Sequence, residues 1–182
     1  MSATRIGRAL RRRGETLAVV ETSAGGLLLA ALLQVPGASA WLVGGVVPYS
    51  ASARRALLGV EDLGAAGAVS EEAALRLADA ARQRLGADWA VAETGIAGPQ
   101  TGRQSSKPAG LTCLALVGPA MRRSATVQLP DQGRRANMRG FARAAAQFLA
   151  AALEESESVA LRRSRSLRLE NRNVAGGKRW SG

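Results

Sequence analysis

Two short glycine-containing turns combine hydroxyl side chains with glycines, a composition that is suited to bind an anion. Residues 21–26 read Glu-Thr-Ser-Ala-Gly-Gly and residues 94–99 read Thr-Gly-Ile-Ala-Gly-Pro, each directly after an apolar run. Glycines let backbone N–H groups approach a ligand closely, and a helix N-terminus favours negative charge. The alternative is that both are ordinary turns whose hydroxyls only cap the backbone. The pattern alone leaves a small-anion site and plain turns both open.

A third candidate is Ser39, which lies in residues 36–41 (Pro-Gly-Ala-Ser-Ala-Trp). A serine hydroxyl becomes a good nucleophile only when a base accepts its proton. A serine among small residues after a Pro-Gly break is also typical of a simple turn. By itself this segment therefore favours a turn over a catalytic role.

The composition restricts the chemistry further. The chain has no histidine and one cysteine, Cys113, which excludes Ser-His-Asp and Cys-His catalysis, an intrachain disulfide and a Cys-rich metal site. Its only lysines are Lys107 and Lys178, and arginine stays protonated at ordinary pH, so it cannot act as a general base. We therefore expect neither a metal nor a cofactor.

The elements that must position these residues alternate between helices and apolar strands. The glycine turns follow strands predicted over 16–20 and 89–92. Residues 27–35 predict a helix that is apolar all round and therefore buried or at a subunit contact. The further predicted elements are strands over 42–47, 110–117 and 124–129 and helices over 4–13, 51–58, 71–85 and 134–155. This order predicts an α/β fold, a three-layer α/β/α sandwich with a mixed, mostly parallel sheet.

The net charge of +11 lies at the two ends of the chain. Residues 1–13 hold five arginines and no acid, residues 161–182 hold seven basic residues and Glu170, and the remaining basic and acidic residues balance. We predict one domain over residues 1–155 and a basic, disordered tail over 156–182. Such ends favour nonspecific attraction to nucleic acid over specific recognition. No secretory signal or membrane span is apparent, so we expect a soluble, cytoplasmic protein.

Taken in order, these segments resemble the deamidase domain of the CinA family, the nicotinamide-nucleotide amidohydrolases. The family motifs are Glu-Ser-Cys-Thr-Gly-Gly, Gly-(Ser/Ala)-Ser-x-Trp, Val-x-Tyr-Ser-Asn-x-x-Lys-x-x-x-(Leu/Ile)-Gly-Val, Gly-Ala-Val-Ser-Glu, Thr-Gly-Ile-Ala-Gly-Pro and Lys-Pro-x-Gly. Their counterparts here are residues 21–26, 37–41, 47–60, 67–71, 94–99 and 107–110, followed by Arg134. The resemblance covers roughly residues 5–152.

The resemblance implies hydrolysis of nicotinamide mononucleotide to its nicotinic acid form plus ammonia, by a serine that a lysine assists, without a metal. The serine falls on Ser39, the family tyrosine on Tyr49 and the lysine position on Arg54. The implied substrate-binding residues are Thr22, Ser23, Gly25, Gly26, Thr94, Gly95, Ala97, Gly98 and Arg134. The resemblance also implies a homo-oligomer.

Arg54 is the departure that matters most, because it cannot take the proton that a neutral lysine would accept. Ala51 in place of asparagine, and Ser23-Ala24 in place of Cys-Thr, depart from the family as well. The candidates for a replacement base are Glu93, where the family has a small or apolar residue, Glu21 and Lys107, although Lys107 matches another family motif and is better explained as a surface or binding lysine. We expect a domain that binds a pyridine mononucleotide with weak or lost amidase activity. The alternatives are an active amidohydrolase with a displaced base, and a non-catalytic nucleotide-binding or interaction protein whose basic ends attract nucleic acid.

Overall fold

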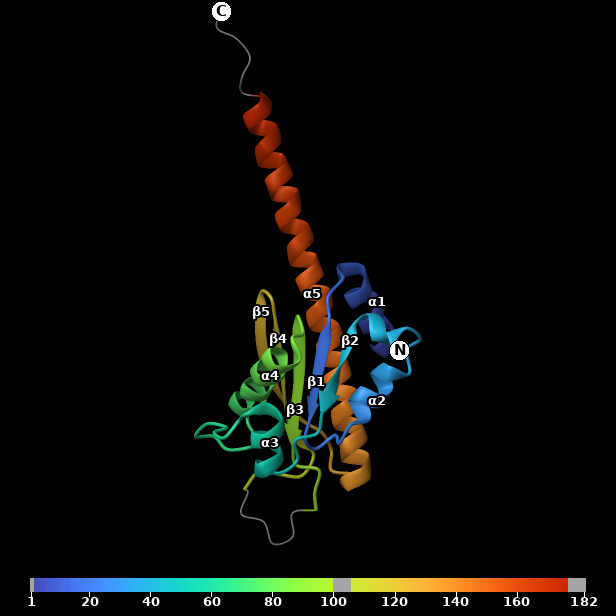
Figure 1. Cartoon of the computed structure of the whole chain (residues 1–182), viewed down its shortest axis with the longest axis vertical. Coiled ribbons are helices and arrows are strands. Elements are labelled where there is room, and N and C mark those ends of the chain that lie inside the picture. Colours follow the sequence, from blue (N-terminus) through green and yellow to red (C-terminus); the bar gives the residue numbers. More distant parts are fainter. Residues whose placement is uncertain (1, 100–105, 177–182) are drawn as a thin grey trace, which may run out of the picture.

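The computed structural model describes residues 2–99 and 106–176, with side-chain burial described as far as Ser158. A five-stranded sheet in the order β2-β1-β3-β4-β5 lies between two layers of helices (Figure 1). The strands are β1 (Leu17–Glu21), β2 (Leu42–Val46), β3 (Trp89–Gly95), β4 (Leu111–Gly118) and β5 (Met121–Gln128). The helices are α1 (Ser2–Arg13), α2 (Leu27–Leu33), α3 (Ala51–Leu58), α4 (Glu71–Leu85) and α5 (Arg134–Gly176), with a 3-10 turn at Ala38–Ala40.

The sheet is mixed, as predicted. Strand β1 pairs in parallel with β2 and β3, whereas β4 is antiparallel to both β3 and β5. Only β4 therefore runs against the common direction, and β4 and β5 form the predicted hairpin. The α/β fold class is confirmed. Because β1, β2 and β3 are parallel, their carboxyl ends meet at one edge of the sheet, where α/β proteins place their ligands.

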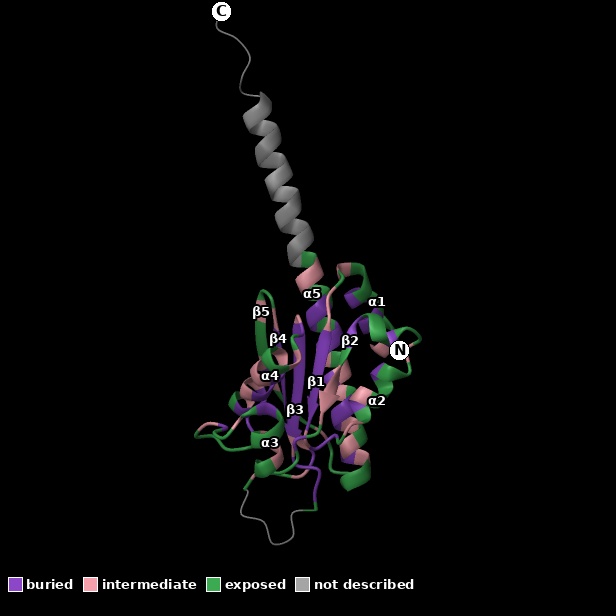
Figure 2. Cartoon of the chain, in the orientation of Figure 1, coloured by how far each residue is buried: buried purple, intermediate pink, exposed green. Residues whose placement is uncertain are grey.

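Successive side chains of each strand point to opposite faces of the sheet, so the protein has two hydrophobic cores. Leu17 and Val19 of β1 pack with α1, α2 and α5, whereas Ala18 and Val20 pack with α3 and α4. Figure 2 shows β1 and β3 buried in the centre of the molecule. The second core consists largely of alanines on both sheet and helix, which allows α4 to lie close to the strands.

Helix α4 begins and ends where its sequence predicts. Ser70 accepts a hydrogen bond from the Ala73 N–H at 3.0 Å, and its own hydroxyl donates to the Gly67 carbonyl. Gly86 ends the helix with a φ of 62°, a left-handed conformation that favours glycine. The Ser70 bonds also fix the loop before α4, which returns to the carboxyl edge of the sheet.

Helix α5 is longer than predicted. The sequence predicts that it ends at Glu155 and that residues 156–182 form a disordered tail, but the helix continues to Gly176 and projects beyond the sheet (Figure 1). The prediction weighted serine and glycine too heavily, because the arginine, leucine, alanine and glutamate of this segment are good helix formers. Residues 177–182 lie outside the described residues. Nowhere in residues 2–99 and 106–176 is a helix both long and apolar enough to cross a bilayer.

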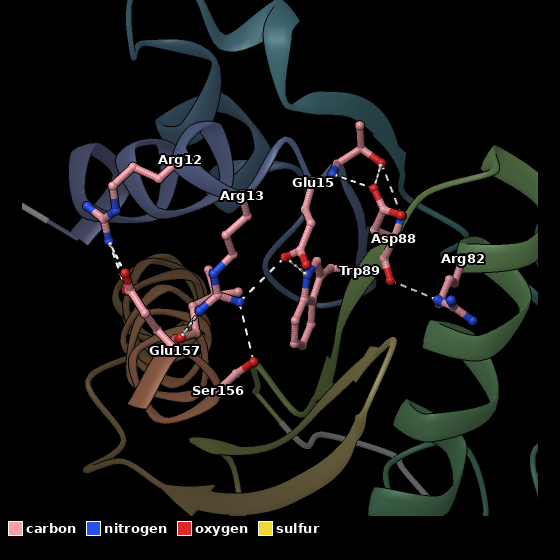
Figure 3. Close-up of polar contacts among 10 residues, drawn as sticks. Arg12, Arg13, Glu15, Arg82, Asp88, Trp89, Ser156 and Glu157 are labelled. Atoms are coloured by element: carbon pink, nitrogen blue, oxygen red, sulfur yellow. Dashed lines mark hydrogen bonds and ion pairs between the residues drawn. The ribbon is translucent and has the colours of Figure 1, made fainter. Parts of the chain in front are cut away.

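The arginines of α1 connect it to α5 (Figure 3). Arg12 pairs with Glu157 at 2.8 Å, and Arg5 pairs with Glu154. Arg13 donates to the Ser156 hydroxyl at 3.3 Å, to the Leu153 carbonyl and to Glu15. The N-terminal arginine cluster is therefore partly structural and not simply a solvated basic end.

We predict that Arg13→Ala lowers the free energy of unfolding by about 2 kcal/mol, because hydrogen bonds from a charged donor are worth roughly 1.5–3 kcal/mol. The Arg13 side chain is only 14% exposed, and its guanidinium lies 6.0 Å from the centre of the Trp89 ring. Arg8→Ala is the matched control, because Arg8 is exposed on the same helix. Urea unfolding of the two variants checks this, and equal losses would contradict the role given to Arg13.

Candidate functional site

A pocket opens at the carboxyl ends of β1 and β3, where the two glycine-containing turns meet. Its walls come from these turns, from α3, from the loop before α4 and from the first turn of α5. The lining residues are Thr22, Ser23, Tyr49, Arg54, Leu63, Ala68, Val69, Leu77, Thr94, Gly95, Ile96, Ala97, Gly98, Pro99 and Arg134. Most of the predicted site residues therefore come together here.

Hydrogen bonds tie the two turns to each other. The Ser23 hydroxyl donates to the Gly95 carbonyl at 2.7 Å and accepts from the Gly95 N–H at 2.6 Å. The Thr22 N–H donates to the Glu93 carbonyl at 3.1 Å. The Thr94 hydroxyl donates to the Ala68 carbonyl at 2.7 Å. The hydroxyls of the pocket are thus held by backbone groups, which fixes where they can meet a ligand.

Two arginines give the pocket a positive charge. Arg134, in the first turn of α5, donates to the Gly98 carbonyl at 2.8 Å and to the Tyr49 hydroxyl at 3.1 Å. Arg54 reaches the pocket from α3, and its Nε is buried without a partner among the described residues. No carboxylate lies among the described residues that line the pocket. This arrangement attracts an anion.

The end of the turn after β1 is bonded within the protein, so Gly25 and Gly26 lie outside the pocket lining, whereas Thr22 and Ser23 belong to it. Gly25 and Gly26 adopt φ values of 69° and 94°, which other residues avoid. Glu21 accepts hydrogen bonds from the N–H groups of Gly26 and Leu28 at 3.1 and 3.0 Å through one oxygen. Its other oxygen accepts from Leu29 at 2.8 Å. The start of α2 therefore already holds a carboxylate, and neither glycine lines the pocket.

Glu93 supports the same turn from β3. It is 0% exposed, and one oxygen accepts from the N–H groups of Ser23 and Ala24 at 3.0 and 2.8 Å. The other oxygen accepts from the Thr112 hydroxyl at 3.0 Å. Burial raises the pKa of Glu93 to about 7, outweighing these hydrogen bonds, and the neighbouring Glu21 charge adds to the increase. Burial raises the pKa of Glu21 as well.

Neither buried carboxylate is placed to act as the base of the pocket. Glu93 and Glu21 direct their oxygens at backbone N–H groups and do not line the cavity. Lys107, the third replacement base, also stays outside the lining. Its ammonium donates to the carbonyls of Val69 and Ala66 and so holds the loop before α4.

Ser39 lies at the amino ends of the parallel strands, at the opposite end of the sheet from the pocket. It is exposed in the 3-10 turn before β2, and the pairing of Leu17 with Leu42 places this turn beside the start of β1. The pocket lies at the carboxyl end of β1, whereas Ser39 lies near its amino end. The five residues of β1 separate the two by about 17 Å, at roughly 3.3 Å per residue. Ser39 is therefore not in the pocket of its own chain. The sequence held the signal, because a residue just before a parallel strand lies at its amino end.

Sequence reasoning missed the apolar wall of the pocket. Leu63, Ala68 and Val69 come from the loop between α3 and α4, and Leu77 comes from α4 itself. The usable signal was the start of α4 at Ser70, because a helix that leads back into a parallel strand begins at the carboxyl edge of the sheet. Within the described part of the chain, no cluster of three or more acidic or cysteine side chains is placed to hold a metal ion.

The model of the CinA C-terminal domain matches residues 1–153. The chain belongs to the CinA family. A CinA-like protein of Prochlorococcus marinus (strain MIT 9313) is 48% identical over 112 residues, 60% of this chain and 26% of that protein. A CinA-like protein of Frankia casuarinae is 44% identical over 135 residues, 73% of this chain and 30% of that protein. The chain thus spans under a third of the length of these relatives.

Solved structures of CinA-family proteins share the fold. The CinA superfamily protein KP700603 from Klebsiella pneumoniae 700603 superposes with a TM-score of 0.76 at 30% identity, covering 85% of this chain and 96% of that one. The competence/damage inducible protein CihA from Agrobacterium tumefaciens superposes with a TM-score of 0.72 at 32% identity, with the same coverage. The CinA resemblance predicted from the motifs is confirmed.

We predict that Glu93→Gln makes the stability of the protein less dependent on pH. Because the pKa of Glu93 rises from 4.5 to about 7 on folding, the folded state favours the protonated acid. The stability that this acid contributes is complete below pH 4.5 and is lost as the pH rises to about 7. The neutral amide can still accept from Ser23 and Ala24 but does not ionise.

Urea unfolding at pH 5 and pH 8 tests this. The free energy of unfolding of Glu93→Gln, relative to the natural protein, should increase by on the order of 2 kcal/mol between the two pH values. If the free energies of unfolding of the variant and the natural protein differ by the same amount at pH 5 and at pH 8, Glu93 keeps one protonation state across this range and the prediction is wrong.

Proposed function

We propose that this CinA-family chain binds a phosphate-bearing pyridine mononucleotide at the carboxyl edge of its sheet and hydrolyses the amide weakly or not at all. One observation carries this proposal. Among its described lining residues, the pocket combines two arginines and several fixed hydroxyls with no histidine, lysine, aspartate or glutamate that could accept a proton. It is equipped to recognise an anion but not to activate a nucleophile.

The polar and the apolar parts of the pocket lining both support ligand binding. Arg134 is held in place by Gly98 and Tyr49, so its guanidinium is positioned before a ligand arrives. A positioned arginine suits a phosphate because its planar group offers paired donors. Leu63, Val69 and Leu77 also line the pocket and provide apolar surface for an aromatic base. A mononucleotide joins a phosphate to such a base.

Support for weak catalysis comes from the missing base. The hydroxyls of Ser23 and Thr94 donate to backbone carbonyls, which cannot accept a proton permanently. The lining holds no lysine, histidine, aspartate or glutamate among the described residues. Residues 100–105, which lie outside the described residues, contain none of these types in sequence either.

We predict that nicotinamide mononucleotide raises the melting temperature of the natural protein and that Arg134→Gln abolishes this increase. Arg135→Gln is the matched control, because Arg135 is the exposed neighbour of Arg134 and does not line the pocket. Ammonia release should stay near the uncatalysed rate. Rapid ammonia release by the natural protein would contradict the proposal, as would an unchanged ligand response in folded Arg134→Gln.

An amidohydrolase built from two copies of the chain is the second candidate function. Ser39 cannot reach the pocket of its own chain, but β2 is an edge strand, and apolar side chains are exposed on and beside it. They are Leu27, Leu33, Val43, Val47 and Leu57, with exposures between 38% and 60%. An edge strand with exposed apolar residues favours self-association. A homo-oligomer formed there could bring Ser39 of one copy to the pocket of another.

We predict that Arg54→Lys increases ammonia release from nicotinamide mononucleotide and that adding Ser39→Ala removes the gain. A lysine can become neutral and accept the serine proton, which arginine cannot do. The gain should stay below the roughly 10²–10⁴-fold that a well-placed general base supplies, because Ala51 departs from the family as well.

Mixed oligomers distinguish a shared site from a site within one chain. Arg54→Lys/Ser39→Ala retains the pocket but lacks the serine, whereas Arg54→Lys/Arg134→Gln retains the serine but lacks the phosphate contact. Each should be inactive alone, and their mixture should regain activity in a shared site. Equal activity of Arg54→Lys with and without Ser39 would exclude this serine.

Nonspecific binding of nucleic acid through the basic ends is a further proposal with less support. Arg5, Arg12 and Arg13 of α1 already contact carboxylates or carbonyls on α5. Any affinity that the remaining basic residues produce should fall steeply as salt increases.

A further inference from the structure

Arg54 is the charged group of the pocket whose hydrogen-bonding capacity is unused. Its Nε is buried without an acceptor, and no ion pair or side-chain hydrogen bond involves its guanidinium among the described residues. Its neighbour Arg55 approaches Glu61 at 3.6 Å, and Arg76 pairs with both Asp62 and Glu72 at 2.8 Å. Arg134, in the same pocket, uses two of its donors on Gly98 and Tyr49. Arg54 therefore differs from the other arginines around it.

The buried Nε of Arg54 is unfavourable without an acceptor, because this N–H has lost water and gained nothing in exchange. Arginine cannot escape by losing its proton. The described lining of the pocket offers no carboxylate to Arg54, which leaves its guanidinium available to an anionic ligand. The guanidinium group matches a carboxylate or phosphate through two parallel N–H donors.

The two arginines reach the pocket from opposite sides of the sheet. Arg54 belongs to α3, which packs with α4 on one face, whereas Arg134 begins α5 on the other face. Arg134 is anchored beside the turn that contains Gly98, and Arg54 has no such anchor among the described residues. Two cations that approach from different elements suit a ligand with two anionic groups.

We infer that Arg54 forms a carboxylate-binding subsite, so that the pocket prefers a mononucleotide with a carboxylate on its base over the corresponding carboxamide. This inference rests on the proposed function, in which Arg134 and the fixed hydroxyls hold the phosphate. A carboxylate presents two acceptors to the guanidinium. A carboxamide presents one acceptor and an NH₂ donor, and arginine has no acceptor to offer that donor.

Arginine instead of lysine at this position would therefore reverse the preference of the pocket, from the amide to the acid. A site with a neutral lysine at this position can hold an uncharged amide and take up a proton, whereas a site with Arg54 stabilises the acid that deamidation would produce. The chain would then retain the acid mononucleotide instead of turning over the amide. The chemistry of Arg54 thus assigns a ligand class to the pocket: a nucleotide with a phosphate and a second, planar anion.

Calorimetric titration of the full chain with nicotinic acid mononucleotide and with nicotinamide mononucleotide tests the subsite. The natural protein should bind the acid about 10- to 100-fold more tightly, the factor that a hydrogen-bonded charge pair supplies. Arg54→Gln should bind the two ligands within about threefold of each other, because glutamine can donate to either one without a charge. Arg55→Gln is the matched control on the same helix and should keep the preference for the acid.

The outcomes separate this inference from the proposed function. If the natural protein binds both ligands with equal affinity, the carboxylate subsite is overturned while the proposed binding function stands. If Arg54→Gln weakens both ligands by the same factor, Arg54 contacts the shared phosphate and the subsite is again overturned. If neither ligand binds, the proposed function fails and the inference fails with it. The two affinities measured in the natural protein test the carboxylate subsite even if the Arg54→Gln variant does not fold.

Discussion

Two carboxylates inside the protein hold the turn on which the pocket is built. Glu21 and Glu93 lie opposite each other on the paired strands β1 and β3, and both are almost fully buried. Two acids so close and so far from water would be costly if their oxygens had no partners. Five backbone N–H groups and the Thr112 hydroxyl supply those partners. These hydrogen bonds fix the shape of the turn, because the same N–H groups would otherwise be unpaired.

This internal arrangement also determines what the pocket can offer a ligand. Because the N–H groups of Gly26, Leu28 and Leu29 are already bonded to Glu21, they are not available to an anion in the pocket. The positive charge then comes from Arg54 and Arg134, which belong to elements that lie outside the two turns. Ser23 is the link between the two parts, because its backbone N–H contacts Glu93 while its hydroxyl ties the turn to Gly95. Two buried acids thus lie beneath the site, and two arginines supply the positive charge in its lining.

Most of the fold could be predicted from the sequence because its signals are local. Alternating apolar strands, the Ser70 cap and the glycines after α3 and α4 each identify a boundary without knowledge of the rest of the chain. The pairing of the two turns was predictable for a related reason, since both follow parallel strands. The position of Ser39 depended on strand direction, which motif order alone does not include. The end of α5 was misplaced because helix propensity was given less weight than the content of serine and charge.

The roles of Glu21 and Glu93 were harder to foresee. A carboxylate next to a glycine turn is compatible with catalysis, ligand binding or capping, and only the direction of its oxygens distinguishes these roles. That direction follows from which face of β1 and β3 each side chain occupies, and hence from the register that pairs the two residues. Register is a property of the assembled sheet, so no single segment of the sequence contains it.

Helix α3 is a small element that carries a large share of the pocket's chemistry. Of its eight residues only Leu58 is buried, and the turns and buried acids beneath the site belong to other elements. A change on this helix therefore alters what the pocket attracts at little cost to the sheet or to its two cores. Selection can act on such a helix almost independently of the scaffold, so related proteins can diverge in ligand while their architecture stays fixed. Position 54 is where that independence is greatest, because its side chain lines the pocket and makes no hydrogen bond to the described part of the protein.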